Sequence, residues 1–444
     1  MTTIRHGIDT RIIWAIAIPA MLTNVATALI GIGDMWIVGR LEDAATQGAV
    51  DVGARLFALL FTVMNFLKTG TTGLVAQGGT RHGVHAQAET LVRGLVIGFG
   101  IAAALLLAKP VLQPLLLSAL GAQGDVLAAA RVYADIRYFT APGVMANLAL
   151  VGFLVGRRQV RTAMAVEIGY NLLNVGLGLW FVLGLDMGIA GIGWSSFAAE
   201  YAKLALLALL VLRGAAGGEV LAALRNRSVI AWASLRPFLS INRDLFLRTV
   251  ILMIAGAALT RIGAERGAVT LAANGILYQL FVFMALLLDG FENAAQVLNG
   301  ERYGAHDRVG FLRVTKAILW RGFAVAFLLA AAFLVTAGPV IVSFAATPAV
   351  AIAAFKVAPW MVLIPLAGVA SFVFDGVFVG ASWTRALLLS MAGAALVYAL
   401  AIWATWSMGN QGLWASFALF LVARAALQAL MLPRLAEGIA DERR

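Results

Sequence analysis

Long apolar stretches separated by short polar breaks run along the whole chain. A helix needs about 20 mostly apolar residues to cross a bilayer, and twelve stretches fit that length. The predicted spans are residues 12–38, 48–77, 90–118, 128–156, 161–184, 189–213, 236–262, 270–299, 311–337, 350–380, 386–406 and 411–433. The pattern therefore predicts an all-α integral membrane protein with twelve transmembrane helices.

The composition agrees with this pattern and excludes other classes. Hydrophobic residues make up 62% of the 444 residues and charged residues only 12%, against roughly 25% charged in an average soluble domain. The net charge is +11, but Lys and Arg stand singly between apolar runs, which argues against nucleic-acid binding. Without cysteine, a disulfide framework or a thiolate metal site is excluded. The first apolar run is too long for a signal peptide, so we interpret it as an uncleaved span.

The positions of the basic residues predict the orientation. Arginines gather in the alternate breaks that follow the even-numbered spans, as at Arg81, Arg157 and Arg158, and few occur on the other side. Cytoplasmic loops carry an excess of Lys and Arg. We therefore expect both chain termini to face the cytoplasm, which an even number of spans also requires.

Glycine motifs recur at a nearly constant separation along the chain. The stretch Gly152–Gly156 reappears as Gly376–Gly380, and each copy is followed by an arginine. Gly39 is matched by Gly263 at the same separation. Gly188 and Gly191 are matched by Gly409 and Gly412 at a slightly shorter separation. Three pairs in the same order indicate a repeat of six spans, with both copies entering the membrane in the same direction. The fold prediction becomes two parallel, pseudo-symmetric six-helix bundles.

The longest polar break lies near the middle of the chain. It contains three glycines together with Arg225 and Arg227. We therefore predict an N-terminal six-helix lobe at 1–213, a cytoplasmic linker at 214–235 and a C-terminal six-helix lobe at 236–444.

Ionisable residues inside the predicted spans are the candidate functional groups. Each costs roughly 2.5–3.5 kcal/mol on insertion scales, so those that persist usually face a cavity or a partner. Asp34 lies in the outer half of the first span; the alternative is a carboxylate at the interface, paired with Arg40. Asp375 lies in the tenth span with no cation near it in the sequence. Burial favours the neutral form of such a carboxylate, so Asp375 could hold and release a proton, or simply hydrogen-bond within the bundle.

Other charged residues suggest pairs. Arg248 in span seven, with Asp289 and Glu292 in span eight, could form a charged network. Glu200 and Lys203 are three residues apart in span six and are placed to neutralise each other. Lys68 in span two needs a partner that the sequence does not identify, and Glu167 in span five either snorkels or faces a cavity.

Enzyme chemistry finds no support in the sequence. Motifs for a zinc protease, a nucleotide-binding loop and a nucleophile elbow are absent, and the four histidines fall at predicted cytoplasmic ends of helices. We expect no metal site and no cofactor. A channel is also disfavoured, because channels usually show rings or short filter motifs.

Several segments together resemble one transporter family. They are Ile18–Gly39 with Gly33-Asp34, Gly70–Gln77, Ile241–Arg248, Leu288–Phe291 and Phe374–Gly380. In order and over essentially the whole chain, they resemble the multidrug and toxic compound extrusion (MATE) family, in particular its DinF-type branch.

The resemblance implies a secondary active exporter of amphipathic, often cationic, organic compounds that works by alternating access. In the family, the residue matching Asp34 is the principal cation-coupling group, and the neighbouring positions match Asn174 and Ser196. A carboxylate commonly follows four residues after the Asn, where this chain has Gly178. That departure favours inward proton movement over sodium coupling. Asp375 matches a cation site proposed in another branch of the family.

The resemblance also implies a monomer in the bacterial inner membrane that handles small organic substrates. An apolar and aromatic cavity wall is expected, although the same side chains could face lipid. The candidate cavity residues are Trp36, Phe61, Met64, Phe153, Arg248, Met284, Asp289 and Phe291. A lipid-linked precursor flippase of the wider superfamily is an alternative, for which a more cationic cavity is expected.

Overall fold

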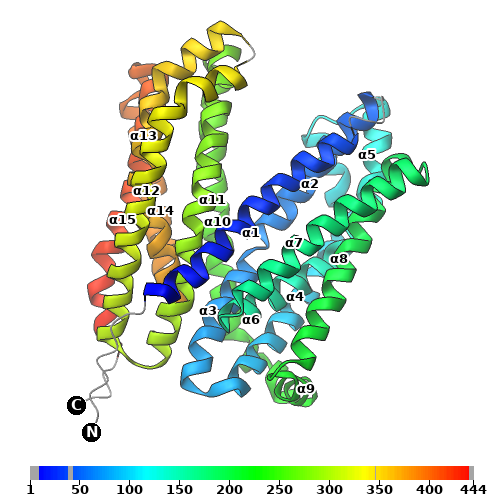
Figure 1. Ribbon diagram of the computed structural model, residues 1–444, viewed down its shortest axis with the longest axis vertical. Coiled ribbons are helices and arrows are strands. Elements are labelled where there is room, and N and C mark those ends of the chain that lie inside the picture. Colours follow the sequence, from blue (N-terminus) through cyan, green and yellow to red (C-terminus); the bar gives the residue numbers. More distant parts are fainter. Residues whose placement is uncertain (1–9, 39–43, 346, 440–444) are drawn as a thin grey trace. The chain divides into compact units, whose positions relative to one another are not determined.

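The computed structural model describes residues 10–38, 44–345 and 347–439, without the side chains of residues 10, 27–48 and 51. All regular structure in these residues is helical (Figure 1). The first helices are α1 (Thr10–Val38), α2 (Ala44–Val63), α3 (Phe66–Arg81), α4 (Gly83–Ala119), α5 (Gly124–Arg137), α6 (Ala141–Gly156), α7 (Val160–Leu179), α8 (Gly188–Arg213) and α9 (Gly217–Arg225). They are followed by α10 (Trp232–Glu265), α11 (Ala268–Gly304), α12 (Arg308–Phe344), α13 (Pro348–Gly380), α14 (Thr384–Ala404) and α15 (Gly409–Glu437). Short helical turns at Tyr138–Thr140, Trp180–Gly184, Arg227–Ile230 and Trp406–Met408 connect some of them.

The helices have the length and composition of membrane spans. Within the described residues, eleven helical segments are long and apolar enough to cross a bilayer, and Arg11–Ala26 of α1 forms a shorter apolar segment. Leu107, Val335 and Trp403 are each at least 80% exposed, as expected for side chains that contact lipid rather than water. The predicted all-α membrane fold is confirmed, and every predicted span after the first coincides with one of the eleven segments.

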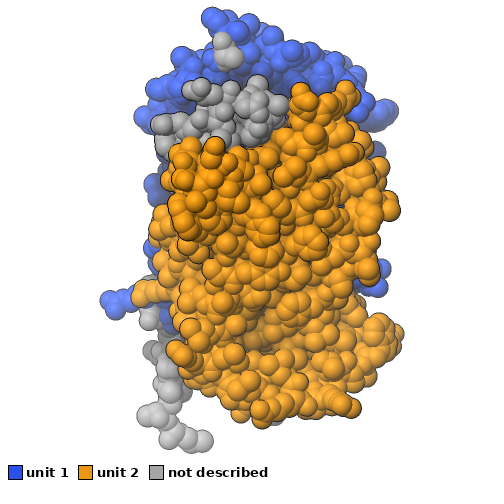
Figure 2. Space-filling view, turned by 90° about the vertical axis from the view of Figure 1, so that its right-hand side faces the viewer, with its two compact units in different colours: residues 1–21, 243–444 blue, residues 22–242 orange. Residues whose placement is uncertain are grey.

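Contacts between helices divide the chain into two units (Figure 2). Unit 1 comprises Met1–Met21 and Arg243–Arg444, and unit 2 comprises Leu22–Asn242. Each has its own apolar core. In unit 2, Phe57, Tyr133 and Tyr138 stack edge to face, and in unit 1 the rings of Tyr398, Trp414, Phe417 and Phe420 pack together.

The first copy of the glycine motif brings α6 against α3 in unit 2. A Cβ atom on Gly152 would lie 2.7 Å from the carbonyl oxygen of Lys68, and one on Gly156 would lie 2.7 Å from that of Thr72. The Thr72 hydroxyl also donates to the carbonyl of Gly152 at 3.2 Å. The two helices therefore meet backbone to backbone, which only glycine permits here.

The second copy makes the same contact in unit 1, where α13 packs on α11. A Cβ atom on Gly380 would lie 2.6 Å from the carbonyl oxygen of Gln296, and one on Gly376 would overlap the carbonyl of Glu292. The four residues of this contact correspond one by one to the four in unit 2, and each follows its counterpart by the same number of residues. The counterparts of Lys68, Thr72, Gly152 and Gly156 are Glu292, Gln296, Gly376 and Gly380. The internal repeat predicted from the glycine motifs is thus present in the helix packing.

Candidate functional site

A buried ion cluster surrounds Asp375 in unit 1. This residue is 1% exposed in the interior of α13. Its Oδ2 atom accepts from Arg424 Nη2 at 2.5 Å and also from Arg248, and its Oδ1 atom accepts from Gln428 Nε2 at 2.6 Å. Helices α10, α13 and α15 therefore converge on one carboxylate.

The geometry of α15 explains why two partners come from one helix. Arg424 and Gln428 are four residues apart, so they lie on the same helical face, one turn above the other. The guanidinium of Arg424 also lies 5.8 Å from the ring centre of Phe372 and 5.7 Å from that of Phe420. Apolar rings and one carboxylate thus hold a cation that is 2% exposed.

The sequence shows no positively charged side chain close to Asp375 along the chain. The structure corrects the inference that this carboxylate is unpaired, because two arginines are bonded to it. Both arginines come from distant parts of the chain, at sequence separations of 127 and 49 residues. Two guanidinium groups stabilise the ionised carboxylate. Asp375 is therefore an ion-paired group rather than an isolated one.

Asp289 and Glu292 of α11 belong to the same electrostatic neighbourhood. Their carboxylates, like that of Asp375, attract the guanidinium group of Arg248 electrostatically. Glu292 also interacts electrostatically with Arg424. The structure thus brings together the predicted residues Arg248, Asp289 and Asp375. Among the described residues, no group of three or more His, Asp or Glu side chains could hold a metal ion.

The predicted polar residues of unit 2 lie where α7 and α8 pack together. Asn174 is 5% exposed, and its Oδ1 atom accepts from the Ser195 hydroxyl at 3.3 Å. The hydrogen bond thus comes from Ser195, whereas the predicted Ser196 lies next to it and is equally buried. Gly178 lies one turn beyond Asn174 and is buried as well.

A half-buried ion pair lies in the same interface. Lys203 Nζ lies 2.7 Å from Glu167 Oε1 and 4.7 Å from the ring centre of Tyr170. Glu200 accepts from Asn147 Nδ2 at 2.7 Å. The spacing of Glu200 and Lys203 predicted a pair between these two residues, but the ammonium group bonds to α7 instead. The carboxylate paired with Lys203 is therefore Glu167 on the neighbouring helix, while Glu200 bonds to Asn147.

The predicted apolar cavity residues are largely part of the helix packing. Phe153, Met284 and Phe291 are 1%, 7% and 0% exposed. Phe61 packs on Phe57, with ring centres 5.5 Å apart, and Met64 is half-buried.

Two of the predicted residues fall on α1, where side chains are not described. Asp34 and Trp36 lie within the helix Thr10–Val38, but their contacts are outside the described residues. Lys68 is half-buried on α3, and in the described part of unit 2 its side chain forms no ion pair.

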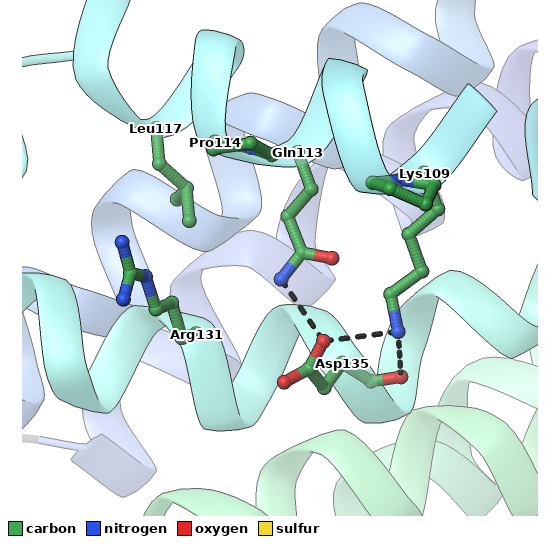
Figure 3. A pocket seen from close by; sticks show the side chains of 7 residues that line it. Lys109, Gln113, Pro114, Leu117, Arg131 and Asp135 are labelled. Carbon is green, nitrogen blue, oxygen red and sulfur yellow. Dashed lines mark hydrogen bonds and ion pairs between the residues drawn. The ribbon is translucent and has the colours of Figure 1, made fainter.

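A surface pocket of about 460 Å³ opens between α4 and α5 (Figure 3). Asp135 receives contacts from two α4 side chains there, with Lys109 Nζ at 2.9 Å and Gln113 Nε2 at 3.1 Å. The rest of the wall is formed by Pro110, Pro114, Leu117 and Arg131. Because the carboxylate is paired with a lysine of the pocket itself, these contacts mainly join the two helices.

The fold and these clusters define a class of protein. Many apolar spans, an internal repeat and buried ionisable groups in each unit are typical of membrane transporters. A family profile described as MatE matches residues 19–180 and 245–403. The chain belongs to the MATE family.

Relatives agree with this assignment. The DNA damage-inducible protein F of Escherichia coli (strain K12) is 33% identical over 417 residues, which cover 93% of this chain and 89% of that protein. The multidrug export protein MepA of Staphylococcus aureus (strain RF122) is 20% identical over 280 residues, covering 62% of this chain and 60% of MepA. A solved structure described as the outward-facing conformation of a multidrug resistance MATE family transporter superposes with a TM-score of 0.84 at 15% identity, covering 97% and 96% of the two chains. These relatives are described as transport or DNA damage-inducible proteins, and the solved structure shows a common fold.

Proposed function

We propose that this protein is a secondary active exporter of amphipathic, cationic organic compounds, driven by inward proton movement through alternating access. The proposal depends on one observation: this chain, which belongs to the MATE family, has buried carboxylates among the apolar helices of both units. Such groups are costly in a membrane and usually mark ion or substrate pathways. The name of the relative MepA, a multidrug export protein, supports the substrate class.

The surroundings of Asn174 favour protons over sodium. A sodium ion needs several oxygen ligands around it, and carboxylates are the strongest of these. Beside Asn174, the described residues offer the hydroxyl of Ser195 and the side-chain-free Gly178. A proton needs only one carboxylate, for which Asp34 is the candidate.

The proposed cycle follows from electrostatics. Ionised Asp34 attracts a cationic substrate, and a proton from the outside neutralises the carboxylate, so the substrate loses its counter-charge and leaves outward. The inward-facing state then releases the proton to the cytoplasm. We place the protein as a monomer in the bacterial inner membrane, with both termini in the cytoplasm.

Asp34→Asn is expected to abolish proton-driven efflux, because the amide cannot exchange a proton, while the protein still folds and inserts. The measurement is the accumulation of ethidium in inside-out proteoliposomes with an imposed proton gradient or, separately, a sodium gradient. Asp186→Asn is the matched control, since Asp186 lies exposed in a connection with a φ of 52° that asparagine tolerates.

Accumulation driven by the sodium gradient alone would contradict proton coupling. Proton-driven accumulation by Asp34→Asn at the wild-type rate would contradict the role of Asp34. Transport of a lipid-linked precursor without ethidium transport would favour the flippase.

A further inference from the structure

A short helix, α9, lies across the ends of the spans of unit 2. In Figure 1 it is seen nearly along its own axis at the lower end of this unit, whereas α4, α7 and α8 are seen from the side. The arginine pattern predicts that this end is cytoplasmic. We call residues 213–236 the crossing segment; it contains α9 and the turn Arg227–Ile230 and ends in the first turns of α10.

Two contacts with α4 set the depth of the crossing segment. Glu219 Oε2 lies 2.9 Å from His85 Nδ1 near the start of α4, and Arg93 Nε donates to the carbonyl of Val229 at 3.3 Å. His85 and Arg93 are eight residues apart, which is about 12 Å of helix. The apolar part of α4 begins directly after Arg93, because residues 94–108 include no charged or polar side chain. The turn at Val229 therefore lies beside the boundary of the apolar region, and Glu219 lies farther outside it.

The crossing segment exposes large apolar side chains at this depth. Val220 and Ala223 are buried against the rest of unit 2. Leu221 and Leu224 are 44% and 54% exposed, and because they are three residues apart they are neighbours on the helix surface. Trp232, beyond the turn, is 70% exposed. Tryptophan is enriched where membrane meets water, and an apolar flank on a helix that lies across the spans suits the boundary between headgroups and acyl chains.

The same segment is positively charged. Its exposed arginines are Arg213, Arg225, Arg227 and Arg236. Within the described part of unit 2, none of these four has an ion pair, and the one carboxylate of the segment, Glu219, is bonded to His85. Lipid phosphates complement such a surface, and each arginine close to an anionic membrane strengthens binding by about a factor of five.

We propose that the crossing segment is an interfacial element that binds anionic phospholipids of the cytoplasmic leaflet. Leu221, Leu224 and Trp232 enter the boundary between headgroups and acyl chains, and the arginines bind the lipid phosphates. The segment connects α8 to α10, which continues into unit 1, so these lipids hold the connection between the two units at the membrane surface. The inference depends on the predicted orientation of the chain, and it is independent of the transported compound and of the coupling ion.

The test uses the full-length protein with one nitroxide label at a time, which the absence of cysteine permits. Leu224→Cys places the label on the apolar flank. Ala222→Cys is the matched control, because this exposed position lies two residues away and thus about 200° around the helix. In bilayers of phosphatidylcholine with phosphatidylglycerol, spin resonance measures the accessibility of each label to oxygen, which dissolves in lipid, and to a nickel chelate, which stays in water. The Leu224 label is expected to meet mainly oxygen, and the Ala222 label mainly the chelate.

A double variant, Arg225→Gln with Arg227→Gln, tests the role of charge. It should raise several-fold the fraction of phosphatidylglycerol at which the Leu224 label is half shielded from the chelate, because two of the attracted charges are lost. High salt should act in the same direction. Arg131→Gln, at an exposed position on α5, should leave that fraction unchanged. All three arginines are exposed, so these variants retain the packed core.

Equal accessibility of the two labels to the chelate in membranes with phosphatidylglycerol would overturn the proposal. Shielding of the Leu224 label from both reagents would also overturn it, because the side chain would then be packed against protein. If the Leu224 label meets oxygen to the same extent in phosphatidylcholine alone, the segment enters the membrane without anionic lipid, and the assignment of its partner is wrong.

Discussion

Asp375→Asn is expected to destabilise unit 1 by about 3–5 kcal/mol, the usual cost of removing one partner from a buried ion pair. The substitution leaves Arg248 and Arg424 close together without the carboxylate between them. The measurement is thermal unfolding of the purified protein in detergent, followed by tryptophan fluorescence. Removing a cation as well, in Asp375→Asn with Arg424→Gln, should recover part of the loss, because the excess positive charge is then smaller.

Asp186→Asn serves as the control for the chemical change, since it replaces an exposed carboxylate by the same amide. An unfolding temperature of Asp375→Asn equal to that of this control would show that the cluster contributes no stability. A double variant less stable than Asp375→Asn alone would show that Arg424 is held mainly by the rings of Phe372 and Phe420.

Gly376→Ala is expected to destabilise the protein by about 1–3 kcal/mol, the usual cost of adding atoms to a packed interior. The upper end of that range is expected, because the new methyl group would meet the backbone of Glu292, which cannot rotate away as a side chain can. The same unfolding measurement applies, together with the fraction of protein that elutes as a single species in size-exclusion chromatography.

Gly275→Ala on α11 is the matched control. A Cβ atom at this exposed position meets nothing within 4 Å, and alanine favours a helix over glycine by up to about 1 kcal/mol. This variant should therefore be slightly more stable than the wild type. Equal stability of the two variants would mean that α11 and α13 separate at little cost.

The membrane fold could be predicted from the sequence because it depends on local information. Length and hydropathy define each span, and the constant separation of the glycine motifs, as between Gly152 and Gly376, was sufficient to indicate the repeat. The close contact between helices at these glycines follows from the absence of a side chain, which is visible in the sequence itself.

The pairing of charged residues could not be predicted in the same way. Partners within a helix can be found from their spacing, which led to Glu200 and Lys203, but Lys203 is bonded to Glu167 on another helix. Arg424 was missed because a single arginine inside a long apolar span does not identify its partner. The internal repeat could have indicated Arg424. It follows Lys203 by the same number of residues by which Gly412 follows Gly191, so the two cations occupy matching positions of the repeat.

The glycine contacts also limit how each unit can deform. Where backbones touch, at Gly152 against Lys68 and at Gly380 against Gln296, side-chain rotation cannot create room for one helix to slide past the other. Sliding would require the helices to separate first and lose their contacts along several turns. Each of these two helix pairs is therefore expected to move as a rigid unit. Conformational changes should instead occur at the other helix contacts and in the connections.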